Sequence, residues 1–199
     1  MDLNERRVGR ARDRAIDTRV LEVARRHLSR DGFEGMSLTA VASEAGTTRQ
    51  ALYRRWPSKA HLAAAVVTSL GEAPAAAAAP SEPFDALVAE LTDFARGVSM
   101  PGRLSLVGAM LQDTADPTVV ARYRAHVIAP RRDRLRAILE RACDQGLIDA
   151  GGDLEVALTM CTGSWYGRAL AGDPPPVDWP RRAAALVWRA VGGSTPGAA

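Results

Sequence analysis

The chain has 199 residues and a formal net charge of +3, and only 5% of its residues are aromatic. No apolar run approaches the length of a membrane span, and the charged N-terminus is unlike a signal peptide, so we expect a cytoplasmic protein with no membrane partner. Cys143 and Cys161 lack metal-binding spacing, so we expect no disulfide, no metal ion and no cofactor.

The positive charge is concentrated near the N-terminus. Residues 1–60 hold 13 Lys and Arg against 8 Asp and Glu, whereas residues 61–199 hold 13 against 15. This asymmetry predicts that the N-terminal segment faces a polyanion, with the arginines between Arg6 and Arg14 as a basic arm. The alternative is that the arginines form only a solvated face.

Apolar residues four positions apart predict a first helix over residues 11–31, which ends at Gly32. Ser37 is a suitable N-cap for a short second helix, and Gly46 is a suitable stop for it. No strand pattern occurs in the chain, so these features favour an all-α fold.

A third helix follows a short turn, with Thr47 or Thr48 as its N-cap. Pro57 ends it, and Ser58 caps a fourth helix that runs to about Leu70. Residues 37–56 are therefore predicted to form a helix, a tight glycine turn and a second helix, the pattern of a helix-turn-helix.

Residues 71–83 contain three prolines around an alanine run, which favours a connector over a helix. The following part is predicted to be a helical bundle, with Pro130 as a kink or break. Its amphipathic segments are residues 84–99, 103–113, 117–146, 154–171 and 179–192. The chain is thus predicted to have about nine helices.

The third helix carries the residue types that read DNA. Arg49 and Gln50 lie in its first turn, where Arg can pair with guanine and Gln with adenine. Thr39 and Thr48 are further candidates near the bases or the backbone. Candidate phosphate contacts are Tyr53, Arg54, Arg55 and Lys59. Trp56 is interpreted as a packing residue at the helix junction.

The run GFEGMSLTAVASEAGTTRQALYRRWPSKAHL, residues 32–62, resembles the N-terminal domain of the TetR family of bacterial transcriptional regulators. The resemblance implies a homodimer that binds double-stranded DNA at a palindromic operator, usually represses, and leaves DNA when a small molecule binds. By matching position it implies phosphate contacts from Ser37, Thr48, Tyr53 and Lys59, and base contacts from Thr39, Arg49 and Gln50. Ala60 departs from the acidic residue that is common there, and Trp56 replaces the usual Phe.

The resemblance also implies the domain organisation. Residues 1–70 would form a three-helix helix-turn-helix domain, residues 71–83 a connector, and residues 84–199 a helical ligand-binding and dimerisation domain. Residues 131–170 resemble such C-terminal domains more loosely. The candidates for burial between two subunits are Leu158, Cys161, Trp165, Leu186, Trp188 and Val191.

A ligand cavity is predicted among the helices of residues 84–171, and its apolar character predicts a small hydrophobic or amphipathic effector whose identity is unknown. Each lining candidate has ordinary core packing as its alternative. The candidates are Phe94, Val107, Met110, Leu111, Tyr123, His126, Trp165 and Tyr166, and Gln112 is a further polar one.

Two rival functions are weighed against a DNA-binding regulator. No catalytic residues are predicted: the three histidines are far apart in the chain, and Cys161 with His126 has no third group to orient it, so we expect no enzyme. The other rival is a ligand-binding helical adaptor protein that does not use its helix-turn-helix on DNA. The intact Tyr, Arg and Lys set around the third helix favours the regulator.

Overall fold

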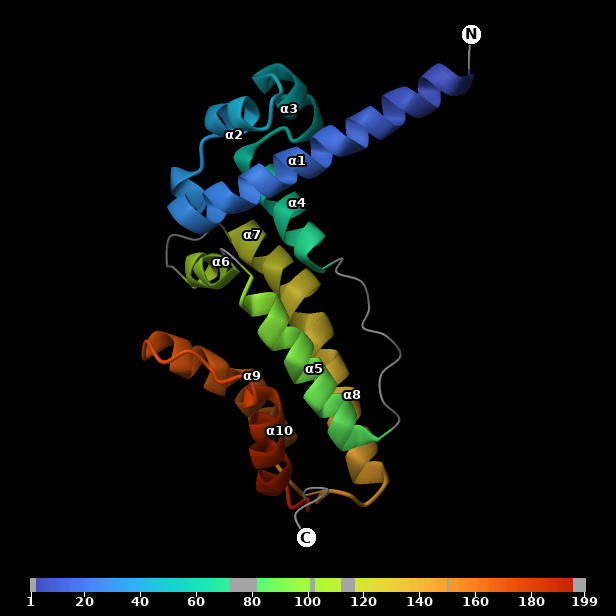
Figure 1. Ribbon diagram of the computed structural model, residues 1–199, viewed down its shortest axis with the longest axis vertical. Coiled ribbons are helices and arrows are strands. Elements are labelled where there is room, and N and C mark those ends of the chain that lie inside the picture. Colours follow the sequence, from blue (N-terminus) through green and yellow to red (C-terminus); the bar gives the residue numbers. More distant parts are fainter. Residues whose placement is uncertain (1–2, 72–81, 101–102, 112–116, 150, 195–199) are drawn as a thin grey trace. The chain divides into compact units, whose positions relative to one another are not determined.

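The computed structural model describes residues 3–71, 82–100, 103–111, 117–149 and 151–194, with side chains from residue 14 onward apart from Ser105 and Ala109. This part of the chain contains ten α-helices and one short π-helical segment and no strand, which confirms the all-α fold (Figure 1). If the adjoining segments of residues 117–144 are counted as one run, the helices number nine. Most of the predicted connector, Gln112 and the side chains of residues 1–13 lie outside the described residues.

The first helix, α1 (Leu3–Gly35), is longer than its apolar pattern predicted. Gly32 interrupts it with φ +71°, a left-handed backbone conformation that L side chains rarely adopt. The predicted stop is therefore at the right residue, and a short helical piece follows it.

Two short helices come next, α2 (Leu38–Glu44) and α3 (Arg49–Arg55). The Ser37 hydroxyl accepts a hydrogen bond from the Ala40 N–H at 3.3 Å, and the Thr48 hydroxyl accepts one from the Ala51 N–H at 3.1 Å. Thr48, not Thr47, is therefore the cap of α3. The predicted succession of a helix, a turn and a second helix is confirmed, and each of the two helices begins at a predicted N-cap residue.

The chain divides into two compact units, residues 1–73 with 100–128 and residues 74–99 with 129–199. In the first unit, α1 packs on α4 (Lys59–Gly71) and on α6 (Arg103–Met110), while α4 packs on α7 (Pro117–Tyr123) and on the π-helical η1 (Arg124–Ile128). Its core joins apolar residues of α1, α2, α3, α4, α6 and α7. The division places residues 100–128 with the N-terminal residues, whereas the predicted boundaries place them in the C-terminal domain; those boundaries stay a prediction.

Within its described residues, the second unit contains four helices, α5 (Pro83–Val98), α8 (Ala129–Asp144), α9 (Leu154–Leu170) and α10 (Trp179–Ala190). α5 packs on α8, α9 and α10, and α9 packs on α8 and α10. Its core is rich in large side chains, among them Phe84, Phe94, Trp165, Trp179 and Trp188. Asp153 caps α9 by accepting a hydrogen bond from the Val156 N–H at 3.0 Å.

The helical irregularity predicted at Pro130 occurs just before it. η1 covers residues 124–128, and Pro130 lies in the first turn of α8. Proline has no N–H, so the carbonyl four residues earlier loses its usual helical partner, and the helix widens locally instead of breaking.

Candidate nucleic-acid interface

The first turn of α3 presents two polar side chains to solvent. Arg49 and Gln50 are both exposed, whereas Leu52, at 1% exposure, anchors the helix in the core of the first unit. Thr39 is exposed on α2, the helix against which α3 packs. The predicted base-reading residues are therefore all exposed, on the two helices of the helix-turn-helix.

Tyr53 holds Arg49 in place. The Arg49 Nη2 atom donates a hydrogen bond to the Tyr53 hydroxyl at 3.3 Å, and the guanidinium lies 5.2 Å from the centroid of the Tyr53 ring. A cation over an aromatic face is attracted by the electrons of the ring. This contact reduces the number of orientations that Arg49 adopts before it meets a partner.

Ser37 and Thr48 are exposed, and both have a hydroxyl next to a helix N-terminus. In each case the hydroxyl oxygen accepts the capping hydrogen bond, so the O–H remains a donor. A phosphate oxygen at these positions would accept from that O–H.

The three other predicted phosphate contacts differ in their surroundings. Arg54 is exposed. Arg55 is paired with Asp17 of α1, and its Nε lies 3.0 Å from the Asp17 Oδ1. Lys59 donates to the Glu34 carbonyl at 2.9 Å, lies 3.5 Å from the Glu34 carboxylate, and sits 4.7 Å from the centroid of the Phe33 ring. Arg55 and Lys59 thus both contact α1.

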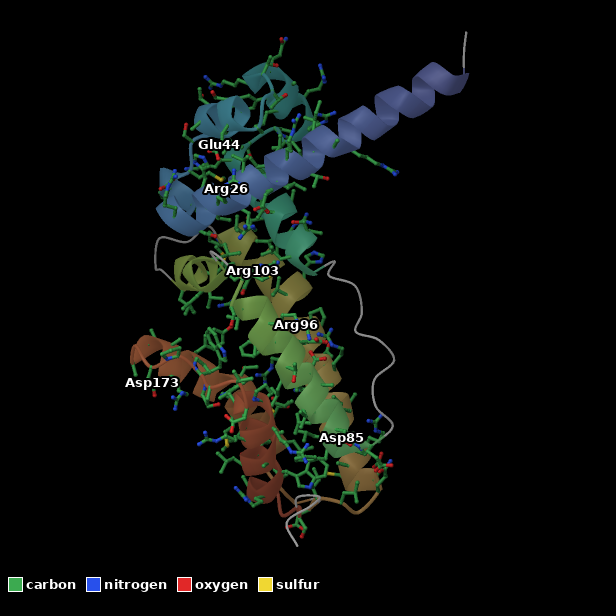
Figure 2. All side chains as sticks on the ribbon, in the orientation of Figure 1. Arg26, Glu44, Asp85, Arg96, Arg103 and Asp173 are labelled. Carbon is green, nitrogen blue, oxygen red and sulfur yellow. The ribbon has the colours of Figure 1, made fainter. Side chains whose placement is uncertain are left out.

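An ionic network that the sequence analysis missed joins α1 to α2. Glu44 of α2 accepts a hydrogen bond from Arg26 of α1 at 2.6 Å (Figure 2). Glu44 also pairs with His27 at 2.9 Å. The hydrogen bond from Arg26, and then that from His27, hold the pKa of Glu44 below its usual range. These partners are 17 and 18 positions apart in the chain, so no local pattern predicted them.

Trp56 is partly buried against the core of the first unit, which confirms its interpretation as a packing residue.

The ligand-binding candidates are divided between the two units. Met110 and Tyr123 are buried in the core of the first unit, Val107 packs against that core, and Leu111 and His126 are exposed. Phe94, Trp165 and Tyr166 contact one another in the second unit, with ring centroids 5.6–6.0 Å apart. Burial raises the pKa of the Tyr166 hydroxyl, which therefore remains a hydrogen-bond donor at neutral pH. Their role in binding a ligand stays a prediction.

Five of the six dimer-interface candidates are buried inside the second unit. Leu158, Cys161, Trp165, Trp188 and Val191 belong to its core, and Leu186 is exposed. All six positions are apolar in the sequence, and an apolar pattern does not distinguish burial within one subunit from burial between two. Val156 and Met160, which line one groove together with Leu186, are also exposed.

An open groove of about 630 Å³ runs along α9 and α10. Val156, Met160 and Leu186 supply its apolar surface, and Arg132 and Glu155 supply charges. Arg132 and Glu155 are themselves paired at 3.0 Å. The groove is therefore largely apolar, with this ion pair and Asp153 as its charged groups.

In the native protein, iodoacetamide should modify Cys143 and leave Cys161 intact. Cys161 is fully buried, and burial raises the pKa of its thiol to about 12, so almost no thiolate is present at neutral pH. Cys143 is only partly buried. Peptide mass spectrometry of the alkylated protein, with urea-unfolded protein as the control, measures both sites. Labelling of Cys161 at the rate of Cys143 would show that it is accessible and would reopen the question of a nucleophile.

Two family models match the chain. The model described as Tetracyclin repressor-like, C-terminal domain, matches residues 81–187, more than half of the chain, and the model described as Bacterial regulatory proteins, tetR family, matches residues 20–66. The chain belongs to the TetR family of bacterial transcriptional regulators. The predicted family is thus confirmed, and the second model covers the capped helices that present Arg49 and Gln50.

Proteins similar to this TetR-family chain have low sequence identity to it. An uncharacterized HTH-type transcriptional regulator, YdeS of Bacillus subtilis (strain 168), is 24% identical over 165 residues, which cover 81% of this chain and 82% of that protein. A TetR family transcription regulator from Marinobacter aquaeolei VT8 superposes with a TM-score of 0.71 at 20% identity, covering 93% of this chain and 100% of that one. The regulator FadR from Bacillus subtilis, in complex with stearoyl-CoA, gives 0.64 at 14% identity, covering 89% and 99%.

None of the helices in the described part of the regulator has both the length and the apolar character that a membrane span requires. In the same part of the chain, no group of three or more His, Cys, Asp or Glu side chains is arranged to hold a metal ion.

Proposed function

We propose that this TetR-family regulator is a cytoplasmic repressor that binds a palindromic operator in double-stranded DNA as a homodimer and leaves it when a small hydrophobic effector binds. The observation that carries the proposal is the exposed first turn of α3, where Arg49 and Gln50 directly follow the Thr48 hydroxyl cap. A second helix of this kind enters the major groove with its N-terminal residues at the base edges.

In this proposal Arg49, Gln50 and Thr39 read bases. Arg49 would donate two hydrogen bonds to a guanine, and Gln50 would pair with an adenine. The contact with Tyr53 supports the role of Arg49, because a side chain that is already oriented loses less conformational entropy on binding.

Ser37, Thr48, Tyr53 and Arg54 are the proposed phosphate contacts, since their hydroxyls and guanidinium are exposed or partly exposed around α3. Lys59 joins them if a phosphate oxygen replaces the Glu34 carboxylate, which is itself 73% exposed. Such an exchange leaves the bond from Lys59 to the Glu34 carbonyl in place.

Binding to an operator duplex should weaken steeply with salt, by about a thousandfold between roughly 50 and 200 mM if six or more phosphates are contacted. The duplex is first selected from a random pool by the full-length protein, and fluorescence anisotropy then measures affinity at each salt concentration. If the selected sequence is palindromic, this supports a protein that binds DNA as a dimer. If no duplex binds at any salt concentration, the regulator proposal fails and the ligand-binding adaptor is favoured.

The proposed homodimer uses the open groove along α9 and α10. A second copy would bury Val156, Met160 and Leu186, which are 53%, 42% and 58% exposed in the single chain. Large apolar side chains that cluster in a surface groove are typical of protein interfaces. The two α3 helices of a dimer would then reach operator half-sites about 34 Å apart or a multiple of that distance.

Leu186→Glu should convert the dimer to monomers without unfolding the subunit. A carboxylate at the centre of an apolar interface loses its hydration, and at an interface with twofold symmetry two copies of the new charge lie close together. Analytical ultracentrifugation measures the mass, and circular dichroism checks the helical content. Ala137→Glu adds the same charge at an exposed α8 position that does not line the groove and should remain a dimer. A dimeric Leu186→Glu variant would place the interface elsewhere.

The effector is proposed to be hydrophobic or amphipathic, bound among apolar residues that include Phe94, Trp165 and Tyr166. Their mutual contacts form an aromatic cluster with one half-buried hydroxyl. The similar fold of FadR, which was crystallised with stearoyl-CoA, supports this class of ligand. A screen for compounds that release the selected duplex tests it, and transcription from a promoter that carries the operator tests repression.

A further inference from the structure

The recognition helix α3 is held in the first unit by few apolar contacts. It has seven residues, of which Leu52 is the buried one, and it packs on α2. Trp56, its C-cap, adds a partly buried ring. A rotation of so short a helix about its own axis would redirect every side chain on its exposed side. The direction in which the Arg49 and Gln50 side chains point therefore depends on the other contacts that α3 makes with the first unit.

Arg55 supplies such a contact from the last turn of α3. Its Nε lies 3.0 Å from the Asp17 Oδ1 of α1, and the two side chains are 22% and 37% exposed. The Asp17 Oδ1 atom itself is buried and accepts no hydrogen bond within the described part of the chain, so Arg55 is its charged neighbour through an ion pair alone. A partly buried ion pair is screened by salt less than an exposed one.

The position of Arg55 on the helix matches this role. It follows Leu52 by three residues, so the two side chains lie on the same side of α3. Arg54, by contrast, is exposed like Gln50, from which it is one helical turn away. The two neighbouring arginines thus face different surroundings, protein for Arg55 and solvent for Arg54.

We propose that Arg55 and Asp17 form a brace that fixes the rotation of α3 and thereby positions Arg49 and Gln50 for base reading. The inference rests on the proposed DNA-binding function. It makes Arg55 a positioning residue, where the sequence analysis expected a phosphate contact. Arg55 also takes part in a further interaction, so loss of Asp17 alone leaves part of its anchorage in place.

The Asp17→Asn variant distinguishes the brace from a simple effect of charge, because the two predict opposite changes in affinity for the operator. The substitution removes a negative charge close to the proposed DNA surface, and charge alone would therefore tighten binding to any duplex. The brace predicts weaker binding to the operator, because α3 loses one of its fixed contacts. Binding to a scrambled duplex does not depend on the orientation of α3, so the affinity for that duplex should stay equal or increase.

The experiment compares full-length variants on the selected operator and on a scrambled duplex of equal length, over a range of salt concentrations. Asp17→Asn and Arg55→Gln should each weaken operator binding by about fivefold. Arg55→Gln should leave the salt dependence of operator affinity unchanged. Arg54→Gln should lower the slope of log affinity against log salt concentration by about 1, as expected for a lost phosphate contact. Glu22→Gln is the matched control, since Glu22 is also on α1 but pairs with Arg25 of the same helix at 2.7 Å.

The charge-reversed pair, Asp17→Arg with Arg55→Asp, provides a rescue. It should recover operator affinity relative to either single reversal, because the ion pair is restored with opposite polarity. If Arg55 instead contacts phosphate, the new aspartate repels DNA and no rescue occurs. Circular dichroism and thermal melting confirm that each variant is folded.

The outcomes distinguish the two proposals. If the wild-type protein binds no duplex in a salt-dependent way, the DNA-binding function itself is wrong. If the wild-type protein binds but Asp17→Asn binds the operator as tightly as Glu22→Gln, or Arg55→Gln lowers the salt slope as Arg54→Gln does, the brace is overturned and the function stands.

Discussion

Arg49→Ala should relax the preference of this regulator at one base pair in each half-site, by about 1–3 kcal/mol per site. Arg49 is exposed at the start of α3 and held over the Tyr53 ring, so its planar guanidinium is available to donate two hydrogen bonds to a guanine edge. Loss of these bonds removes discrimination at that position only. Affinities for a series of operators, each changed at one base pair, provide the measurement.

Arg54→Ala is the control for this prediction. Arg54 lies on the same helix, carries the same charge and is also exposed, but it is outside the first turn. Its loss should weaken binding to all the duplexes alike and lower the salt slope by about 1. If both variants lose the same affinity at every operator position, Arg49 contacts the backbone and the assignment of base reading to α3's first turn is wrong.

Trp188→Ala should lower the free energy of unfolding by about 3–5 kcal/mol, the usual cost of removing a large aromatic side chain from a core. Trp188 is 2% exposed and meets the Phe84 ring edge-on, with centroids 5.4 Å apart. Space for Trp188 is kept by Gly193, where an added Cβ would collide with the Trp188 indole ring. Urea unfolding followed by circular dichroism measures the change without relying on tryptophan fluorescence.

Arg189→Ala is the matched control, because Arg189 is the next residue of α10 and is exposed. It should change the free energy of unfolding by no more than about 0.5 kcal/mol. Equal losses in the two variants would mean that α10 contributes through its helical backbone and not through the burial of Trp188. A small loss in Trp188→Ala would show that the surrounding aromatic side chains close the cavity.

Local chemistry determined where the helices of this chain begin and end. Ser37 and Thr48 cap their helices through hydroxyl groups, and Gly32 and Gly46 have positive φ at predicted stops. These features depend on residues within a few positions of each other, because a cap or a stop acts on the N–H and carbonyl groups of the adjacent turn. The helix-turn-helix and the family were therefore predictable from one sequence.

Longer-range partners followed no such local pattern. The sequence marked Arg55 and Lys59 as cations near DNA, and the structure pairs them with Asp17 and Glu34, which are 38 and 25 positions away. Hydropathy likewise marked Trp188 and Leu186 as apolar without separating core from surface.

The chain alone thus determined the order of its helices, their caps and the position of Arg49 and Gln50 in the first turn of α3. Only the tertiary structure decided which arginine points to solvent, which apolar residues of α9 and α10 remain uncovered, and how α6 and α7 join the N-terminal helices. The reason is physical: a helix end is specified by its own turn, whereas an ion pair or a core contact depends on which helices fold against each other.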